Sequence, residues 1–347
     1  MRILAIDLAK RTSVACLYET KTAEASYRTL PTEPQKFHDL LAEVEPARLV
    51  IEIGPASGWI RDLCEAMGIR LQAAETRGPA WSWRRVKRKS DRQDALKLAQ
   101  LSAMGQITEV HVPAKHVRQW RLLIGYRRAL VKRRTALKNR IRAILETEAR
   151  DLPAGAAGFM GEGLEQLREW ARPMSEAGPE ELWRGMLHEE LTQLEHVRDR
   201  VRSVEARLDA LGHAEDRVQQ LRSIPGVGAR LSEAVVAVID DPHRFRRARQ
   251  VAGYVGLAPR QFQSGSMDRK GRITGAGHRT LRALLVEAAW IALRYNPAAR
   301  AVYEQVRRGS PARKKVAIVA VARRLLTWCW AMLRDGTSWR PPVPTSG

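Results

Sequence analysis

Two seven-residue repeats of apolar side chains limit most strongly how this chain folds. The first repeat is Leu123, Leu130, Leu137 and Ile144, and the second is Leu187, Leu194, Val201 and Leu208. A seam this narrow is typical of long helices that pair as a coiled coil. The middle of the chain is therefore predicted to hold two long helices, which pair either within one chain or across a dimer. Residues 151–179 between them are rich in Gly, Ala and Pro, which predicts a linker or an irregular loop.

The residues before these helices follow a different pattern. Three runs alternate like strands and follow one another closely, which predicts an antiparallel meander: residues 3–7, 14–18 and 26–30. Two predicted helices then alternate with two predicted strands, in the order 34–44, 49–53, 59–67 and 70–74. Meander strands followed by helix–strand units predict a mixed α/β domain.

The composition indicates a polyanionic partner. Lys and Arg number 60 against 38 Asp and Glu, which gives a net charge of +22. Such a surplus favours nucleic acid first and an anionic membrane surface second. Three scattered cysteines form no zinc-site spacing and suggest no disulfide framework, so a reducing cytoplasm is expected. The most apolar predicted helix, residues 316–333, is interrupted by Arg323 and Arg324 and is expected to be too short to span a membrane.

Asp91 and Asp94 lie in the most basic part of the first hundred residues. Ser90 and Gln93 have the spacing of a capping box, which predicts that a helix begins at Asp91. The two carboxylates are then one turn apart and close enough to share a cation. Alternatively, Asp91 only complements the helix dipole and Asp94 is a solvated charge. The basic residues just before them are candidates for phosphate contacts: Arg84, Arg85, Lys87, Arg88 and Lys89.

The first long helix carries basic residues with no acid before Glu146. Such a one-signed face would repel itself unless a phosphate backbone neutralised it, whereas ordinary solvated faces mix signs. The residues that we expect to contact nucleic acid there are Arg127, Arg128, Arg133 and Arg134.

Residues 221–239 have the form of a helix–hairpin–helix. Gly226 and Gly228 would let backbone amides approach a phosphate at the start of the second helix. The alternative is a tight turn between two helices that has no ligand. The net charge of the chain favours contact with DNA.

Residues 259–277 read as a polar loop. The loop contains Ser264 and Ser266 among four basic residues: Arg260, Arg269, Lys270 and Arg272. A serine acts as a nucleophile only where a base takes its proton and cations stabilise the developing charge. His278 lies just past the loop, so a base would come from elsewhere. Taken alone, these residues favour a flexible loop whose arginines clamp phosphate.

Four features occur in one order along the chain: an acid ending the first predicted strand, an acid ending the fourth, the Asp-x-x-Asp helix, and a late basic QSG segment. The stretches ILAIDLAKRTSVACL, LVIEIGPASGWI, KSDRQDALKLA and IPGVGARLSEAVVAVI, together with YVGLAPRQFQSGSMDRKGRITGAGHRTLRALLVEAA, resemble DEDD-type insertion-sequence transposases. More narrowly, they resemble the branch that is guided by a bridge RNA made by the element.

The resemblance implies three regions. Residues 1–110 would form a ribonuclease-H-like (RuvC-like) α/β domain, and residues 111–215 a helical coiled-coil and linker region. Residues 216–347 would form a mostly α serine transposase domain that contains the helix–hairpin–helix-like motif. The partners implied are donor and target DNA, the guide RNA and further copies of the chain, in a dimer or tetramer whose two domains meet across protomers. No membrane is implied, and the expected location is the cytoplasm, at the nucleoid.

The resemblance also assigns a site. Asp7, Glu52, Asp91 and Asp94 would hold Mg²⁺ or Mn²⁺, and oxygen ligands suit both ions. Ser264 would attack a DNA phosphate and form a phosphoserine link, with Ser266 as the fallback. Gly275 stands where the family usually has a lysine.

Two other functions remain open from the residues. The first is a metal-dependent nuclease of Holliday-junction-resolving type, in which Ser264 only contacts phosphate. The second is a non-catalytic protein that binds RNA or DNA.

Overall fold

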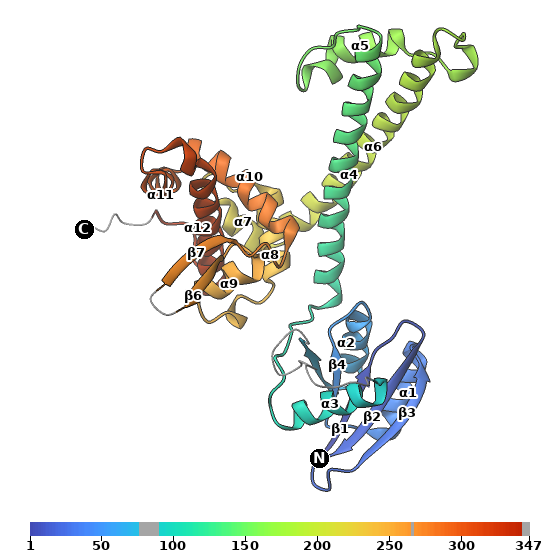
Figure 1. The fold of residues 1–347 in the computed structure, drawn as a ribbon, viewed down its shortest axis with the longest axis vertical. Coiled ribbons are helices and arrows are strands. Elements are labelled where there is room, and N and C mark those ends of the chain that lie inside the picture. The colour runs from blue at the N-terminus through green and yellow to red at the C-terminus, as the bar shows by residue number, and fades with distance from the viewer. Residues whose placement is uncertain (76–89, 265–266, 342–347) are drawn as a thin grey trace. The chain divides into compact units, whose positions relative to one another are not determined.

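The computed structural model describes residues 1–75, 90–264 and 267–341. The chain forms two compact units that divide between Gln119 and Trp120 (Figure 1). The first unit holds a five-stranded mixed sheet in the order β3-β2-β1-β4-β5. Its strands are β1 (Arg2–Asp7), β2 (Thr12–Glu19), β3 (Ala25–Pro31), β4 (Arg48–Glu52) and β5 (Arg70–Ala74). The first three pair antiparallel, which confirms the predicted meander, and β4 and β5 add to β1 in parallel.

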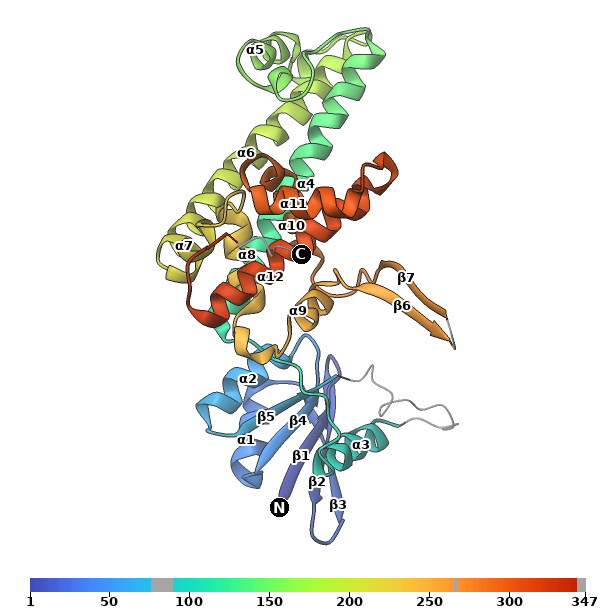
Figure 2. The same cartoon turned by 90° about the vertical axis from the view of Figure 1, so that its left-hand side faces the viewer.

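Helices cover both faces of this sheet. Helices α1 (Pro34–Val44) and α2 (Ser57–Ala66) pack on one face, where Ile6 and Ile51 lie in their core. Helix α3 (Asp91–Ala103) packs on the other face, against Ala5 and Val50 (Figure 2). The central strands are apolar on both sides because both faces are covered. The mixed α/β prediction is confirmed, and the arrangement is consistent with a ribonuclease-H-like fold.

Two long helices pair in the second unit: α6 (Leu182–His213) and the part of α4 (Lys115–Thr147) that follows Gln119. All eight residues of the two repeats lie in or against its core. Ion pairs join Arg127 to Glu205 and Arg140 to Glu190. Because the residue numbers run in opposite directions in the two pairs, the helices are antiparallel, and they pair within one chain (Figure 1).

The connection between α4 and α6 is not the predicted linker. It folds into α5 (Gly161–Trp170), between two short 3₁₀ turns, η2 (Ala157–Phe159) and η3 (Met174–Glu176). Phe159 and Leu167 are fully buried in the core of the unit. Lys138 and Arg142 of α4 also lie over the Phe159 ring, at 4.7 and 5.1 Å from its centroid. These contacts with α4 order a segment that its composition predicts to be irregular.

The remaining helices form one core with the base of α4 and α6. They are α7 (Asp216–Arg222), α8 (Ala229–Ile239), α9 (Ala248–Val255), α10 (Arg279–Tyr295), α11 (Pro297–Arg307) and α12 (Lys314–Asp335), with 3₁₀ turns η4 (Pro242–Arg244) and η5 (Pro311–Arg313). The expected length of α12 was wrong. Residues 311–335 are long and apolar enough to cross a membrane, but 56% of the apolar window is buried inside the protein. Such burial is what a core helix shows.

Candidate active site and nucleic-acid contacts

Two predicted carboxylates end neighbouring strands of the first unit. Asp7 is the last residue of β1 and Glu52 the last of β4, and Ile6 pairs with Ile51 immediately before them. Successive side chains of a strand point to opposite faces. Ala5 and Val50 pack against α3, so Asp7 and Glu52, two residues further on, leave the sheet on the α3 side.

The cap at the start of α3 positions the other two carboxylates. Ser90 is the N-cap, its hydroxyl accepts a hydrogen bond from the Gln93 amide at 3.4 Å, and the helix begins at Asp91 as predicted. Asp94 is only 5% exposed, on the side of α3 whose Ala95 packs on the sheet, whereas Asp91 is exposed. The structure therefore brings Asp94 to the same face as Asp7 and Glu52 and leaves Asp91 at the rim.

These acids suit a hard divalent cation by their chemistry. All of their donors are oxygen atoms, the ligands that Mg²⁺ and Mn²⁺ prefer. Across the described residues, however, no three or more His, Cys, Asp or Glu side chains are grouped closely enough to hold a metal ion. The structure thus shows oxygen-bearing side chains on one face of the sheet, but it does not show them close enough together to form a metal site.

Ser264 lies on a β-hairpin and not in the predicted loop. Strands β6 (Pro259–Ser264) and β7 (Met267–Ile273) pair antiparallel, and Ser264 ends β6 opposite Met267 (Figure 2). Ser266 is outside the described residues. Of the four predicted basic contacts, Arg260 lies on β6 and the other three on β7: Arg269, Lys270 and Arg272. Ser264 therefore lies at the end of a regular strand.

A close backbone approach holds the base of this hairpin. Gly256 and Gly277 have positive φ angles of 79° and 84°. A Cβ on Gly256 would lie 1.7 Å from the Ala276 carbonyl oxygen, and one on Gly277 would lie 2.0 Å from that of Tyr254. Only glycine fits at both positions. The Arg282 guanidinium ties the same segments by donating to the Val255 and Ala276 carbonyls.

The residues flanking the hairpin have structural roles. Gly275 has φ +67°, a conformation that suits glycine better than the lysine that the resemblance predicts there. His278 is the N-cap of α10, and its Nδ1 accepts from the Leu281 amide at 3.3 Å. Burial lowers the pKa of His278, with the charges of Arg121 and Arg282 adding to the effect. The lowered pKa favours the neutral form of this histidine.

The segment predicted to be a helix–hairpin–helix contains α7 and α8, joined by a short turn. Gly226 has φ +92°, and a Cβ there would lie 2.6 Å from the Ala292 Cα of α10, so the packing of α10 already requires this glycine. Gly228 is the N-cap of α8 and has open space where a Cβ would stand. Gly228 is thus the better placed of the two for a phosphate.

The basic residues of α4 divide into two groups. Some neutralise acids of the protein itself: Arg127 binds Glu205, and Arg118, within the first unit, forms two hydrogen bonds with Asp62. Others have no carboxylate partner among the residues that the structure describes, namely Arg128, Arg133 and Arg134. The prediction of a wholly unneutralised face was wrong because α6 supplies acids to α4. The basic residues 84, 85 and 87–89 lie outside the described residues.

One basic cluster was not anticipated from the sequence. Burial lowers the pKa of Lys138 and of Arg198, and neighbouring cations that include Arg134 add to both effects. Lys138 and Arg134 come from α4 and Arg198 from α6, so the cluster depends on the pairing of the helices. Arg198 stands between Glu195 and Asp199 in the sequence, so no local pattern signals this cluster.

Two family models match the chain. Residues 4–148 match the DEDD transposase domain of IS110 elements, described as a transposase, and residues 218–304 match the model described as "Transposase IS116/IS110/IS902 family". Two segments of the chain are therefore similar to IS110/IS116-family transposases. The first contains Asp7, Glu52, Asp91 and Asp94, and the second contains Ser264.

Curated relatives agree over most of the length. The chain is 29% identical over 297 residues to the transposase for insertion sequence element IS1111A of Coxiella burnetii, covering 85% of this chain and 79% of that protein. It is 27% identical over 330 residues to a probable family 20 transposase of Pseudomonas aeruginosa, covering 87% and 88%. A pilin gene-inverting protein of Moraxella lacunata is 33% identical over 121 residues, 34% of this chain and 37% of that protein.

Proposed function

We propose that the protein is an RNA-guided DNA transposase that breaks and rejoins DNA through Ser264, assisted by Mg²⁺ or Mn²⁺ at Asp7, Glu52, Asp91 and Asp94. The observation that carries the proposal is the shared face of the first unit. Two strand-end acids and a buried helical acid occupy one side of one sheet, within a segment that matches a DEDD transposase model. Like charges on one face favour a bound cation.

The proposed reaction conserves the number of phosphorus–oxygen ester bonds. The Ser264 hydroxyl loses its proton to a base, and its oxygen forms a bond to phosphorus as one bond between phosphorus and a deoxyribose oxygen breaks. The departing deoxyribose oxygen gains a proton. A hydroxyl of a second strand then attacks the phosphoserine, which restores a phosphodiester and frees the serine.

The chain's own residues would orient this reaction. Asp7, Glu52 and Asp94 would bind the ion from the face of the sheet, and Asp91 from its rim. A bound divalent ion would supply positive charge for the phosphate oxygens. Arg260 and Arg272 would bind the phosphate backbone beside the hairpin.

The other parts of the proposal concern partners. Arg128, Arg133 and Arg134, which have no carboxylate partner in the described part of the chain, would bind the phosphates of the guide RNA. The gene-inverting name of one relative supports strand rejoining as well as cleavage. We also propose a homo-oligomer, either a dimer or a tetramer, acting on donor and target DNA.

The deciding experiment compares serine variants for a covalent adduct with labelled DNA, using protein purified with its co-purifying RNA. Ser264→Ala should abolish the adduct, and Ser266→Ala should retain it. If Ser264→Ala still cleaves DNA when Mg²⁺ is present, the metal-dependent nuclease is the better description. If no discrete RNA species co-purifies, the guided part of the proposal fails.

A further inference from the structure

A basic cavity of about 520 Å³ lies in the second unit between α4, α8 and α10. Five basic side chains line it: Arg127, Arg128, Lys132, Arg230 and Arg279. Its apolar walls include Ile124 and Leu284. A cavity of this volume is large enough for a nucleotide-sized ligand and larger than a lone phosphate needs.

Three of these cations are available to a ligand. Arg127 is neutralised by Glu205, and Arg230 bridges Asp209 and Glu233. Arg128 donates only to the Thr280 carbonyl, at 3.3 Å, and neither Lys132 nor Arg279 has a carboxylate partner among the described residues. Cations gathered from α4 and α10 repel one another, so an anion between them would be stabilised.

A second cavity on the coiled coil is a weaker candidate. It has a volume of about 710 Å³ and is also lined by arginines, including Arg168 and Arg202. Those two form ion pairs with Glu195 and Asp199, which line the same cavity. Its charge is therefore more nearly balanced by the protein than that of the cavity beside α10.

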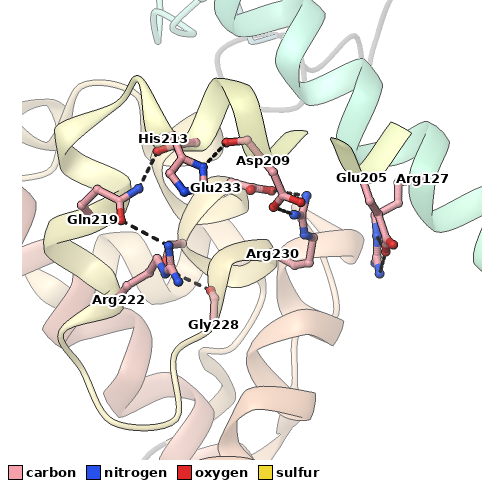
Figure 3. Close-up of polar contacts among 11 residues, drawn as sticks. Arg127, Glu205, Asp209, His213, Gln219, Arg222, Gly228, Arg230 and Glu233 are labelled. Atoms are coloured by element: carbon pink, nitrogen blue, oxygen red, sulfur yellow. Dashed lines mark hydrogen bonds and ion pairs between the residues drawn. The ribbon is translucent and has the colours of Figure 1, made fainter. Parts of the chain in front are cut away.

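The buried Glu233 distinguishes the cavity beside α10. Its side chain is 1% exposed, and its Oε2 accepts from Arg230 Nη1 at 3.0 Å (Figure 3). Its Oε1 has no hydrogen-bond partner in the described part of the chain, and a Cβ built on Gly212 would lie 3.0 Å from it. Burial raises the pKa of this carboxyl to about 7, so it is only partly charged at neutral pH.

Charged groups surround Glu233 on each packed element. The charged or titratable side chains labelled in Figure 3 besides Glu233 are Arg127 of α4, which pairs with Glu205 of α6, Asp209 and His213 of α6, Arg222 of α7 and Arg230 of α8. Helix α10 contributes Arg279 and the exposed Glu287 to the same cavity. Asp209 shares Arg230 with Glu233, so when Glu233 is charged one guanidinium serves two carboxylates.

We propose that this cavity binds one phosphodiester unit of a nucleic-acid strand through Arg128, Lys132 and Arg279, and that the charged form of Glu233 weakens this binding. The sugar or base would pack on the apolar wall at Ile124 and Leu284. Protonation of Glu233 removes a negative charge from the wall of the cavity. Arg230 then pairs only with Asp209 and can also attract the ligand. The inference rests on the proposed function only in taking nucleic acid as the partner.

The test uses the full chain and two dinucleotides, uridylyl-uridine and thymidylyl-thymidine, whose phosphodiesters do not titrate between pH 5 and 8. Calorimetric titration should show saturable binding. Arg279→Gln and Lys132→Gln should each weaken it about tenfold, the effect of one charge-assisted hydrogen bond. Arg307→Gln on α11 is the matched control and should bind as the wild type does. The ratio of the two affinities distinguishes an RNA strand from a DNA strand.

The role of Glu233 has a separate readout. Wild-type affinity should fall severalfold from pH 6 to pH 8, and Glu233→Gln should bind with an affinity that changes little with pH. The site is overturned if the wild type does not bind, or if Arg279→Gln binds as tightly as Arg307→Gln. The role of Glu233 is overturned if Glu233→Gln keeps the wild-type pH profile. Because dinucleotide binding needs no strand cleavage, these results are independent of the Ser264 adduct.

Discussion

Asp94 and Glu233 are both buried carboxylates on helices, one in each unit, and the described groups on the same face or beside them differ. Asp94 lies on the face of the first unit toward which Asp7 and Glu52 also leave the sheet. Glu233 lies in the second unit beside Arg230, with Arg127 and Arg222 contributing further positive charge. Burying a carboxylate is unfavourable unless positive charge or hydrogen bonds offset it.

The two surroundings imply different ligands. In the first unit three acids lie toward one face of the sheet, and the ligand proposed for them is a divalent cation. The second unit supplies its own arginines, and burial still keeps the pKa of Glu233 near 7. The ligands proposed for the two sites are thus a metal ion at one and the anionic backbone of a nucleic acid at the other.

The largest expected effect comes from Asp94→Asn. If Asp94 binds metal, strand exchange should fall by more than about 100-fold, because even groups that only support metal ligands contribute 10- to 100-fold. Raising the Mg²⁺ concentration should restore part of the activity. Activity would be measured by a strand-exchange assay over a Mg²⁺ titration.

The matched control for Asp94→Asn is Asp39→Asn. Asp39 is an exposed acid of α1 in the same unit, and its carboxylate accepts from the Gln35 side chain. Its substitution should leave both activity and Mg²⁺ dependence unchanged. Equal losses in the two variants would remove Asp94 from the proposed metal site.

The second prediction concerns Glu233 and pH. Because its folded pKa is raised from 4.5 to about 7, the folded protein keeps a proton that the unfolded chain has already lost. The free energy of unfolding should therefore fall as pH rises from 4.5 through 7, by about 3 kcal/mol. Glu233→Gln should remove this loss, which urea unfolding at pH 5 and pH 8 would measure.

The control for Glu233→Gln is Glu287→Gln, because Glu287 lines the same cavity but is exposed. The difference in free energy of unfolding between Glu287→Gln and the wild type should be the same at pH 5 and pH 8. A Glu233→Gln difference that does not change with pH would show that Glu233 is charged throughout, and the contrast with Asp94 would disappear.

Local patterns predicted most of the fold. The seven-residue repeats located α4 and α6, and strand alternation located the sheet, because both signals depend only on neighbouring residues. Helix α5 and the β6–β7 hairpin were missed because their order depends on distant contacts. The segment around Phe159 is stabilised by Lys138 of α4, which lies over the Phe159 ring. The base of the hairpin depends on the close approach of Gly256 to the Ala276 carbonyl.

The candidate site was likewise predictable from local patterns but not where it depends on distant contacts. The spacing of Ser90 and Gln93 fixed where α3 begins, but the burial of Asp94 and the exposure of Asp91 depend on how Ala95 packs against the sheet. Glu233 was missed, although a lone acid within the apolar run LSEAVVAVI was visible. Its importance depends on Asp209, which α6 brings from another part of the chain.

The third prediction isolates the arginine that Glu233 shares with Asp209. Arg230→Gln should destabilise the protein by about 2 kcal/mol at pH 8, because two acids then lose their guanidinium. The loss should be smaller at pH 5, where Glu233 is neutral. The double variant Arg230→Gln with Glu233→Gln should recover stability at pH 8, as measured by urea unfolding. No recovery would mean that Arg230 acts mainly through Asp209.

The smallest expected effect is that of an ordinary ion pair in the same unit. Arg127 and Glu205 are 23% and 33% exposed, so solvent screens their attraction. A double-mutant cycle with Arg127→Gln and Glu205→Gln should give a coupling of about 0.5 kcal/mol, which 1 M salt should reduce. Unlike the Arg230–Glu233 coupling, it should not change between pH 6 and pH 8. A coupling as large and as pH-dependent as that of Arg230 with Glu233 would show that burial is not what sets Glu233 apart.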